Sequence, residues 1–264
     1  MTSTSTPTQL PTAPTATTQP GIPFARLLTV EMRKLFDTRA ARIILIIMVA
    51  GAIALQTLEI FLGDKDVPAQ FTSYLELGMT VVLMLVPVVV ILATTAEWSQ
   101  RTAMTTFMWE PRRSRVLTAK GIAALAVSVV SAVVVLVTAV GTAVMGGAMR
   151  PGVEWGLSGS VVLGYVVMLV LLVAQGLAYG SLLHNTAAAL VAYFMAPMVF
   201  TLLTAFIAPL GEVADWVDFN IATSPILAGD FTGDTVLRVV VAVTIWVVVP
   251  GVLGVWRTIR REVK

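Results

Sequence analysis

The sequence predicts an all-α membrane protein with six transmembrane helices and both termini in the cytoplasm. Six apolar runs each approach or exceed the roughly 20 residues that a helix needs to cross a hydrocarbon core of about 30 Å. Lys and Arg gather in alternate flanking segments, where fourteen of the 17 basic residues precede the first run, join the second to the third, or follow the last. The positive-inside rule assigns these three segments to the cytoplasm.

The spans are expected at residues 43–62, 77–96, 121–146, 160–183, 187–210 and 236–256. Valine runs within them, at 133–135 and 247–249, would favour strands in a water-soluble protein. Strands of a membrane barrel alternate in polarity, and these runs do not, so each span is predicted to be a helix.

The segment ahead of the first span divides into two parts. Residues 1–23 carry no charge and are rich in Thr and Pro, which predicts a disordered cytoplasmic tail. Residues 24–37 predict an amphipathic helix lying in the membrane interface, and the remainder, 24–264, forms one six-span domain. The apolar face of this helix comprises Phe24, Leu27, Leu28, Met32, Leu35 and Phe36.

Several functional classes are disfavoured by what the spans lack. No ionisable side chain lies near the middle of a span, which argues against a proton-coupled transporter. The chain has one His, no Cys and no phosphate-binding loop motif, so we expect no enzyme active site, bound cofactor or metal, and no ATP site of its own. The acids of the outer connection, 211–234, are expected to form a solvated surface instead of a metal site.

Gln175 is the one strongly polar side chain well inside a span, and Tyr179 follows it toward the cytoplasmic end. An amide in this position either makes an interhelical hydrogen bond or lines a substrate path. The sequence leaves both interpretations open.

The connection 97–120 is richer than a membrane anchor requires. Glu97 stands at the membrane exit, Pro111 ends a partly apolar stretch, and a basic cluster of Arg112, Arg113 and Arg115 follows. Phe107, Met108 and Trp109 lie beside these arginines, and exposed apolar side chains of this kind suggest a docking surface or shallow membrane contact.

The chain resembles the membrane subunits of type-2 ATP-binding-cassette exporters over about residues 24–260. Arg26, Glu31, Arg33 and Lys34 are similar to the opening helix of that family, with its E-x-[RK]-K core. The order of Glu97, Arg101, Thr102, Pro111, Arg115 and Lys120 looks like its first cytoplasmic loop. Six spans with cytoplasmic ends and a long outer connection before the last span complete the likeness.

The resemblance implies that the loop forms a coupling helix that docks on a separate ATPase subunit, which binds the ATP. Glu97 and Arg101 would orient this element, residues 102–109 would form its contact surface, and the basic cluster would anchor its exit at lipid headgroups. A second copy or a related permease would complete the pore, and short re-entrant helices would occupy the outer connection. Nucleic acid is not an expected partner.

We therefore expect a permease in the plasma membrane of a bacterium that moves an amphipathic or lipid-like substrate outward. One alternative is a secondary transporter or channel that needs no ATPase. Another is a membrane scaffold or sensor subunit that transports nothing.

Overall fold

A computed structural model describes residues 22–100, 102–110 and 112–260, apart from the side chains of Ala103, Phe107, Ala205 and Ala208. Six helices in this part of the chain are long and apolar enough to cross a membrane, which confirms the predicted helical multi-span class. The expected disordered tail lies outside the described residues, except for Ile22 and Pro23.

The elements follow the chain in this order: α1 Phe24–Asp37, α2 Arg39–Leu62, β1 Ala69–Gln70, α3 Phe71–Ser99, α4 Ala103–Trp109, α5 Arg113–Gly147, β2 Val153–Glu154, α6 Gly159–Leu183, α7 Thr186–Phe206, α8 Ala208–Glu212, α9 Ala214–Val217, α10 Phe219–Leu227, α11 Gly233–Val243, the π-helical turn η1 Thr244–Val248, and α12 Val249–Arg260. The two short strands pair in parallel, with Ala69 opposite Val153, and join the α2–α3 connection to the α5–α6 connection.

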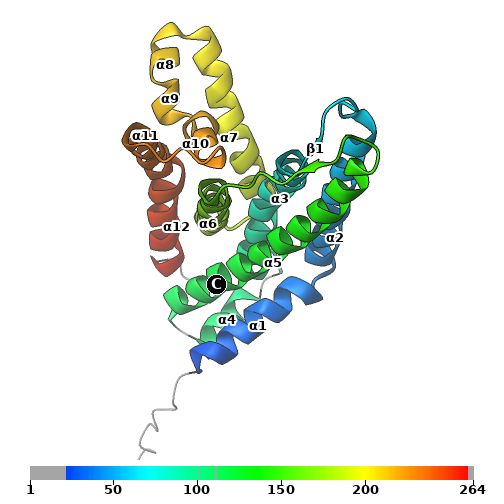
Figure 1. Cartoon of the computed structure of the whole chain (residues 1–264). Coiled ribbons are helices and arrows are strands. Elements are labelled where there is room, and N and C mark those ends of the chain that lie inside the picture. Colours follow the sequence, from blue (N-terminus) through cyan, green and yellow to red (C-terminus); the bar gives the residue numbers. More distant parts are fainter. Residues whose placement is uncertain (1–21, 101, 111, 261–264) are drawn as a thin grey trace, which may run out of the picture.

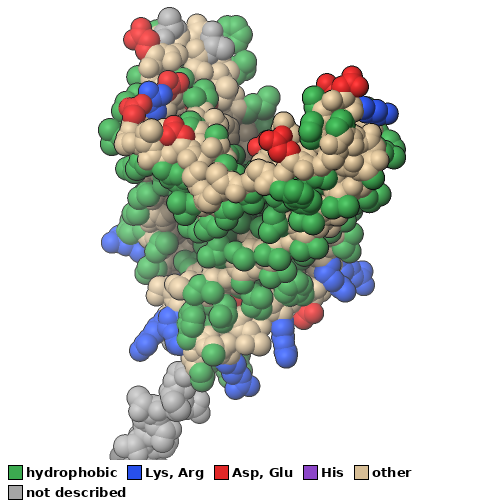
Figure 2. Space-filling model, in the orientation of Figure 1, with side chains coloured by type: hydrophobic (Ala, Val, Ile, Leu, Met, Phe, Trp, Pro, Cys, Tyr) green, Lys and Arg blue, Asp and Glu red, His purple; other side chains and the backbone are tan. Residues whose placement is uncertain are grey.

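The long helices run as a bundle, with the short helices and the strands at its two ends (Figure 1). We call the end that carries α1 and α4 the basic end, and the end that carries α8 to α10 and the short strands the acidic end. Figure 2 shows most of the visible Lys and Arg toward the basic end, most of the visible Asp and Glu at the acidic end, and a broad apolar belt between them. This belt is what six membrane-spanning helices require.

Helix α3 is the central helix of the bundle. It packs against α2, α5, α6 and α7, and α6 in turn packs against α12. Buried α3 side chains such as Tyr74, Val82 and Val90 form the core, whereas the outer faces of α2, α7 and α12 leave many large apolar side chains exposed.

The amphipathic helix α1 forms as predicted, but its apolar face contacts protein. Leu27 packs against Val116 and Ala119 of α5, and Leu35 joins a cluster with residues of α3 and α5. Phe36, expected on the same face, is exposed. The location of α1 in the membrane interface therefore stays a prediction. Since Leu27 and Leu35 face the protein, only the exposed side of the helix, with Phe36, is free to contact lipid.

The fifth long helix ends at Phe206, four residues before the predicted end of the span at residue 210. Pro209 sits in the first turn of α8, and a continuous helix would bring its ring against the carbonyl of residue 205. The chain instead turns through α8 and α9 into α10, whose N-terminus is capped by Asp218: its Oδ1 accepts from the backbone N–H of Asn220 at 2.9 Å and of Ile221 at 3.2 Å.

Helix α10 approaches α6 so closely that only a glycine fits at the crossing. A Cβ placed on Gly164 of α6 would lie 2.0 Å from the backbone oxygen of Ile226. Backbone atoms cannot move aside as the tip of a side chain can, so any larger residue separates the two helices.

We expect Gly164→Ala to lower the free energy of unfolding by about 1–3 kcal/mol, because α10 must shift away from α6. The measurement is thermal unfolding in mild detergent followed by tryptophan fluorescence. Gly141→Ala is the matched control, since nothing lies within 4 Å of a Cβ at that position of α5. Equal midpoints for the two variants would contradict the close α6–α10 contact.

Candidate functional site

Four charged side chains from three helices meet at the basic end, and we call them the charge cluster: Glu31 and Lys34 of α1, Glu97 of α3 and Lys120 of α5. The Lys120 ammonium lies 2.9 Å from Glu31 Oε2 and 3.2 Å from Glu97 Oε1. The Lys34 ammonium lies 2.7 Å from Glu31 Oε1 and 2.8 Å from the same Glu97 oxygen. Two cations therefore share two carboxylates, and the cluster has no net charge.

Lys120 is the most deeply enclosed cation of the cluster, with 3% of its side chain exposed. It donates to Glu31, to Glu97 and to the backbone oxygen of Ala93 at 3.1 Å, so all three of its N–H groups have acceptors. A buried ion pair is tolerated only when its remaining donors and acceptors are satisfied, and this arrangement meets that condition.

Lys34 lies at the rim of the charge cluster and is partly exposed. Burial alone would lower the pKa of its ammonium, but the carboxylates of Glu97 and Glu31 outweigh burial and raise the pKa above its ordinary value. Lys34 therefore carries its positive charge in the folded protein at neutral pH.

The helical repeat of α1 explains why Glu31 is in this cluster. Glu31 follows Leu27 by four residues and precedes Leu35 by four, so it lies on the same buried stripe as these leucines. A carboxylate on an apolar stripe needs a cation from the helix opposite, and Lys120 of α5 supplies it.

The short helix α4 connects to the charge cluster through Glu97. Thr106 Oγ1 donates to Glu97 Oε1 at 3.4 Å, and the backbone N–H of Thr102 donates to the Glu97 carbonyl at 2.9 Å. The outer side of α4 presents Met108 and Trp109, which are 78% and 74% exposed. The predicted contact surface is therefore helical and outward-facing at these two residues, whereas Arg101 and the Phe107 side chain lie outside the described part.

A cavity of about 450 Å³ separates α4 from the helices behind it. All four members of the charge cluster line it, together with Thr102, Thr105 and Thr106. The cavity therefore lies between α4 and the charge cluster.

The exit from α4 is held by a second ion pair. Glu110, which is buried, accepts from Arg115 Nη1 at 2.5 Å and from the backbone N–H of Arg112 at 3.2 Å. Arg115 also donates to the backbone oxygen of Ile22, and Arg113 donates to that of Thr258. Arg113 and Arg115 thus contact protein, whereas Arg112 is exposed and open to the expected headgroup contact.

The candidate residues of α1 separate into two groups. Glu31 and Lys34 belong to the charge cluster, whereas Arg26 and Arg33 are exposed on the other side of the helix. Lys120 was noted in the sequence as the last residue of the loop motif but was given no role, and Glu110 was not singled out. A signal for Lys120 is its place beside the long apolar run of α5, where an isolated cation requires a partner.

The predicted substrate-path residues lie elsewhere in the bundle. Gln175 of α6 is 1% exposed and borders a second cavity, between α6 and the pair α7 and α10. Tyr179 is not among the residues lining this cavity; its ring stands edge-on to Tyr193, 6.0 Å between centroids, and Tyr193 does line it. Tyr193 was not singled out from the sequence.

We expect Lys120→Met to lower the free energy of unfolding by about 3–5 kcal/mol, because two buried carboxylates would then share Lys34 alone. Arg33→Met is the matched control: this cation is exposed on α1, and the change should stay within about 0.5 kcal/mol. Thermal unfolding of the two variants in mild detergent makes the comparison. If both melt together, the charge cluster does not stabilise the fold.

Comparison with family models, with curated proteins and with solved structures finds no match to this chain. The resemblance to type-2 exporters thus rests on the motifs alone, and the assignment of function depends on the arrangement at the basic end.

Proposed function

We propose that this chain is the membrane-spanning permease subunit of an ATP-binding-cassette exporter. It works with a separate ATPase subunit that binds ATP, and with a second permease copy or a related permease. Both termini and the basic end face the cytoplasm of the cell, and the cargo, an amphipathic or lipid-like molecule, leaves toward the acidic end.

The observation that carries this proposal is the position of α4. A seven-residue helix lies beside α1 at the basic end, with Met108 and Trp109 exposed (Figure 1). Large apolar and aromatic side chains exposed on a short element are typical anchors for a partner protein. Their place after the second span is where the resemblance puts a docking helix.

The connection of α4 to the bundle supports transmission of movement. Force on α4 reaches Glu97 through Thr106 and through the Thr102 backbone, and Glu97 is bound to cations on α1 and α5. The cavity behind α4 gives the helix room to move. A partner that pulls on α4 would therefore act on α1, α3 and α5 together.

The distribution of charge supports the orientation. Arg26, Arg33 and Arg112 are exposed at the basic end, and most of the Asp and Glu visible in Figure 2 lie at the other end. The positive-inside rule places such a basic end in the cytoplasm, where ATP is available.

We expect the tagged protein, purified from its own cells in mild detergent, to bring down an ATP-binding-cassette ATPase in stoichiometric amount. Replacing Met108 and Trp109 together with Ala should reduce this capture tenfold or more, because anchors of this kind contribute about 2 kcal/mol or more each. Quantitative mass spectrometry of the purified complexes measures the ratio.

The matched control replaces Met149 and Trp155 with Ala. This pair has the same chemistry and is also exposed, at 59% and 54%, but it lies in the connection that carries β2, which pairs with β1 at the acidic end. Capture that is unchanged by the α4 variant, or equally reduced by both, would contradict docking on α4. Purification of the unaltered protein alone would contradict the exporter and favour an ATP-independent transporter or a scaffold.

A further inference from the structure

The second cavity is large enough for a small molecule. It measures about 860 Å³, within the range of small-molecule sites in proteins. Its walls come from α3, α6, α7 and α10 of a single chain, so no second copy is needed to form it.

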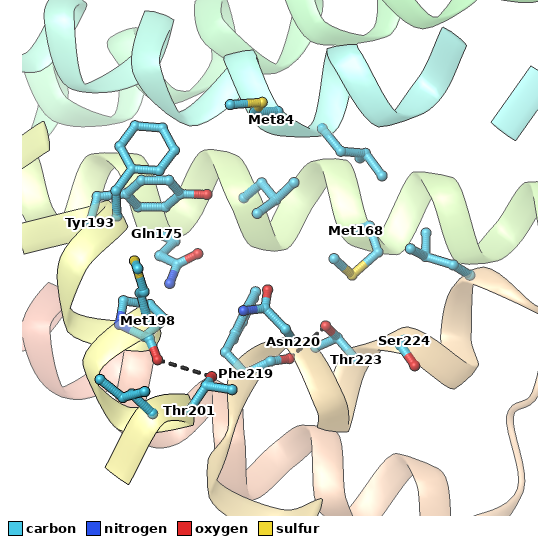
Figure 3. A pocket seen from close by; sticks show the side chains of 16 residues that line it. Met84, Met168, Gln175, Tyr193, Met198, Thr201, Phe219, Asn220, Thr223 and Ser224 are labelled. Atoms are coloured by element: carbon cyan, nitrogen blue, oxygen red, sulfur yellow. Dashed lines mark hydrogen bonds between the residues drawn. The ribbon is translucent and has the colours of Figure 1, made fainter. Parts of the chain in front are cut away.

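Gln175 of α6 is a deeply buried polar side chain that lines this cavity. Its Oε1 is buried and has no hydrogen-bond partner among the described residues. Figure 3 shows the side chain reaching from α6 into the space that faces Met198 of α7 and Asn220 of α10. A buried acceptor without a donor costs free energy, and a ligand with an O–H or N–H group would remove that cost.

The other lining residues define the rest of the ligand. None of the described residues that line the cavity is charged, so a phosphate or ammonium group would lose its hydration without compensation. Three methionines, Met84, Met168 and Met198, give the walls flexible and polarisable contacts that adapt to different apolar shapes.

The cavity is closed on one side and open on another. We call the α6 side of the cavity its floor and the α10 side its roof. Gln175 and Met168 of the floor and Phe219 of the roof are buried, whereas Met84 of α3 and Met198 of α7 are exposed. An apolar molecule can therefore enter between α3 and α7, within the apolar belt.

The roof is a fixed part of the fold. Helix α10 is held to α6 by the close approach at Gly164, and to α7 by a hydrogen bond from Thr201 to the buried carboxylate of Asp218. Trp246 of η1 donates to the backbone oxygen of Val217 at 2.6 Å, which holds the α9–α10 segment from the other side. The cavity thus has walls that are positioned independently of any ligand.

We propose that this cavity binds an uncharged, largely apolar molecule that donates one hydrogen bond to Gln175. That this molecule is the exported cargo rests on the proposed function, whereas its binding in the cavity does not depend on that function. The shape and chemistry fit a long-chain alcohol, or an amide with an apolar body.

The test uses two photoactivatable probes: hexadecanol with a mid-chain diazirine, and the methyl ether of the same compound, which has no donor. The full chain is labelled in phosphatidylcholine nanodiscs, and mass spectrometry locates the adducts. Labelling of α7 and α10 at the cavity is divided by labelling of the exposed apolar face of α2 near Ile46, which corrects for partition into lipid.

We expect the corrected cavity labelling by the alcohol to exceed that by the ether about tenfold. Gln175→Leu should bring the alcohol down to the level of the ether. Gln56→Leu is the matched control, because this buried glutamine of α2 lies outside the cavity and its loss should leave the ratio unchanged.

Equal labelling by the two probes, or adducts confined to the lipid-facing helices, would overturn the proposal. Ser224→Trp decides the matter if Gln175→Leu does not fold. Ser224 is an exposed lining residue of α10, so the indole can fill the cavity, and labelling there by both probes should fall. Unchanged labelling in that variant would overturn the proposal as well.

The two proposals can fail separately. Loss of cavity labelling with continued capture of the ATPase would leave the exporter in place and reject only this binding site. Specific labelling without a captured ATPase would keep the site and reject the exporter.

Discussion

The charge cluster is the interaction on which the basic end depends. Three helices meet there: α1 contributes Glu31 and Lys34, and α3 and α5 contribute one charge each, Glu97 and Lys120. Removing one partner would leave a charge in an environment that cannot solvate it, so the positions of α1, α3 and α5 are fixed relative to one another. Helix α4 connects to this group at both of its ends, through Glu97 at its start and through the ion pair of Glu110 with Arg115 at its exit, and a cavity lies behind it. The basic end therefore combines a buried ionic support with one short, outward-facing helix.

Helix α3 links this support to the second cavity. It carries Glu97 at one end and the cavity-lining Met84 thirteen residues earlier, which corresponds to about 20 Å along the helix. Helix α3 thus connects the charge cluster to the open side of the cavity, with Pro87 between the two. At the acidic end, α10 is held to α6 and α7, and α6 also packs against α3, so the roof and the wall formed by α3 share α6 as a support.

Features that depend on residues close together in the sequence could be predicted, whereas contacts between distant residues could not. Length and hydropathy are local properties, and they place the six long helices and the amphipathic α1. Glu97, Met108 and Trp109 could also be singled out from the sequence, because they interrupt or border apolar runs. The pairing of Glu97 with its cations could not be predicted, since Lys120 reaches Glu97 only when α5 packs against α3. The roof over Gln175 likewise depends on contacts between residues far apart in the sequence, such as Gly164 with Ile226 and Trp246 with Val217, which the hydrophobic pattern does not predict.

Gln175 and the charge cluster represent opposite solutions to the same problem. Both place polar groups among apolar helices, where water cannot compensate for a missing hydrogen bond. In the cluster every N–H of Lys120 has an acceptor, which suits a structural joint. Gln175 keeps an unpaired oxygen beside a cavity whose described lining carries no charge, and its neighbours on α6 and α10 do not satisfy it. An acceptor left open at a fixed position selects for a donor that arrives from outside the chain, which is the property of a binding site.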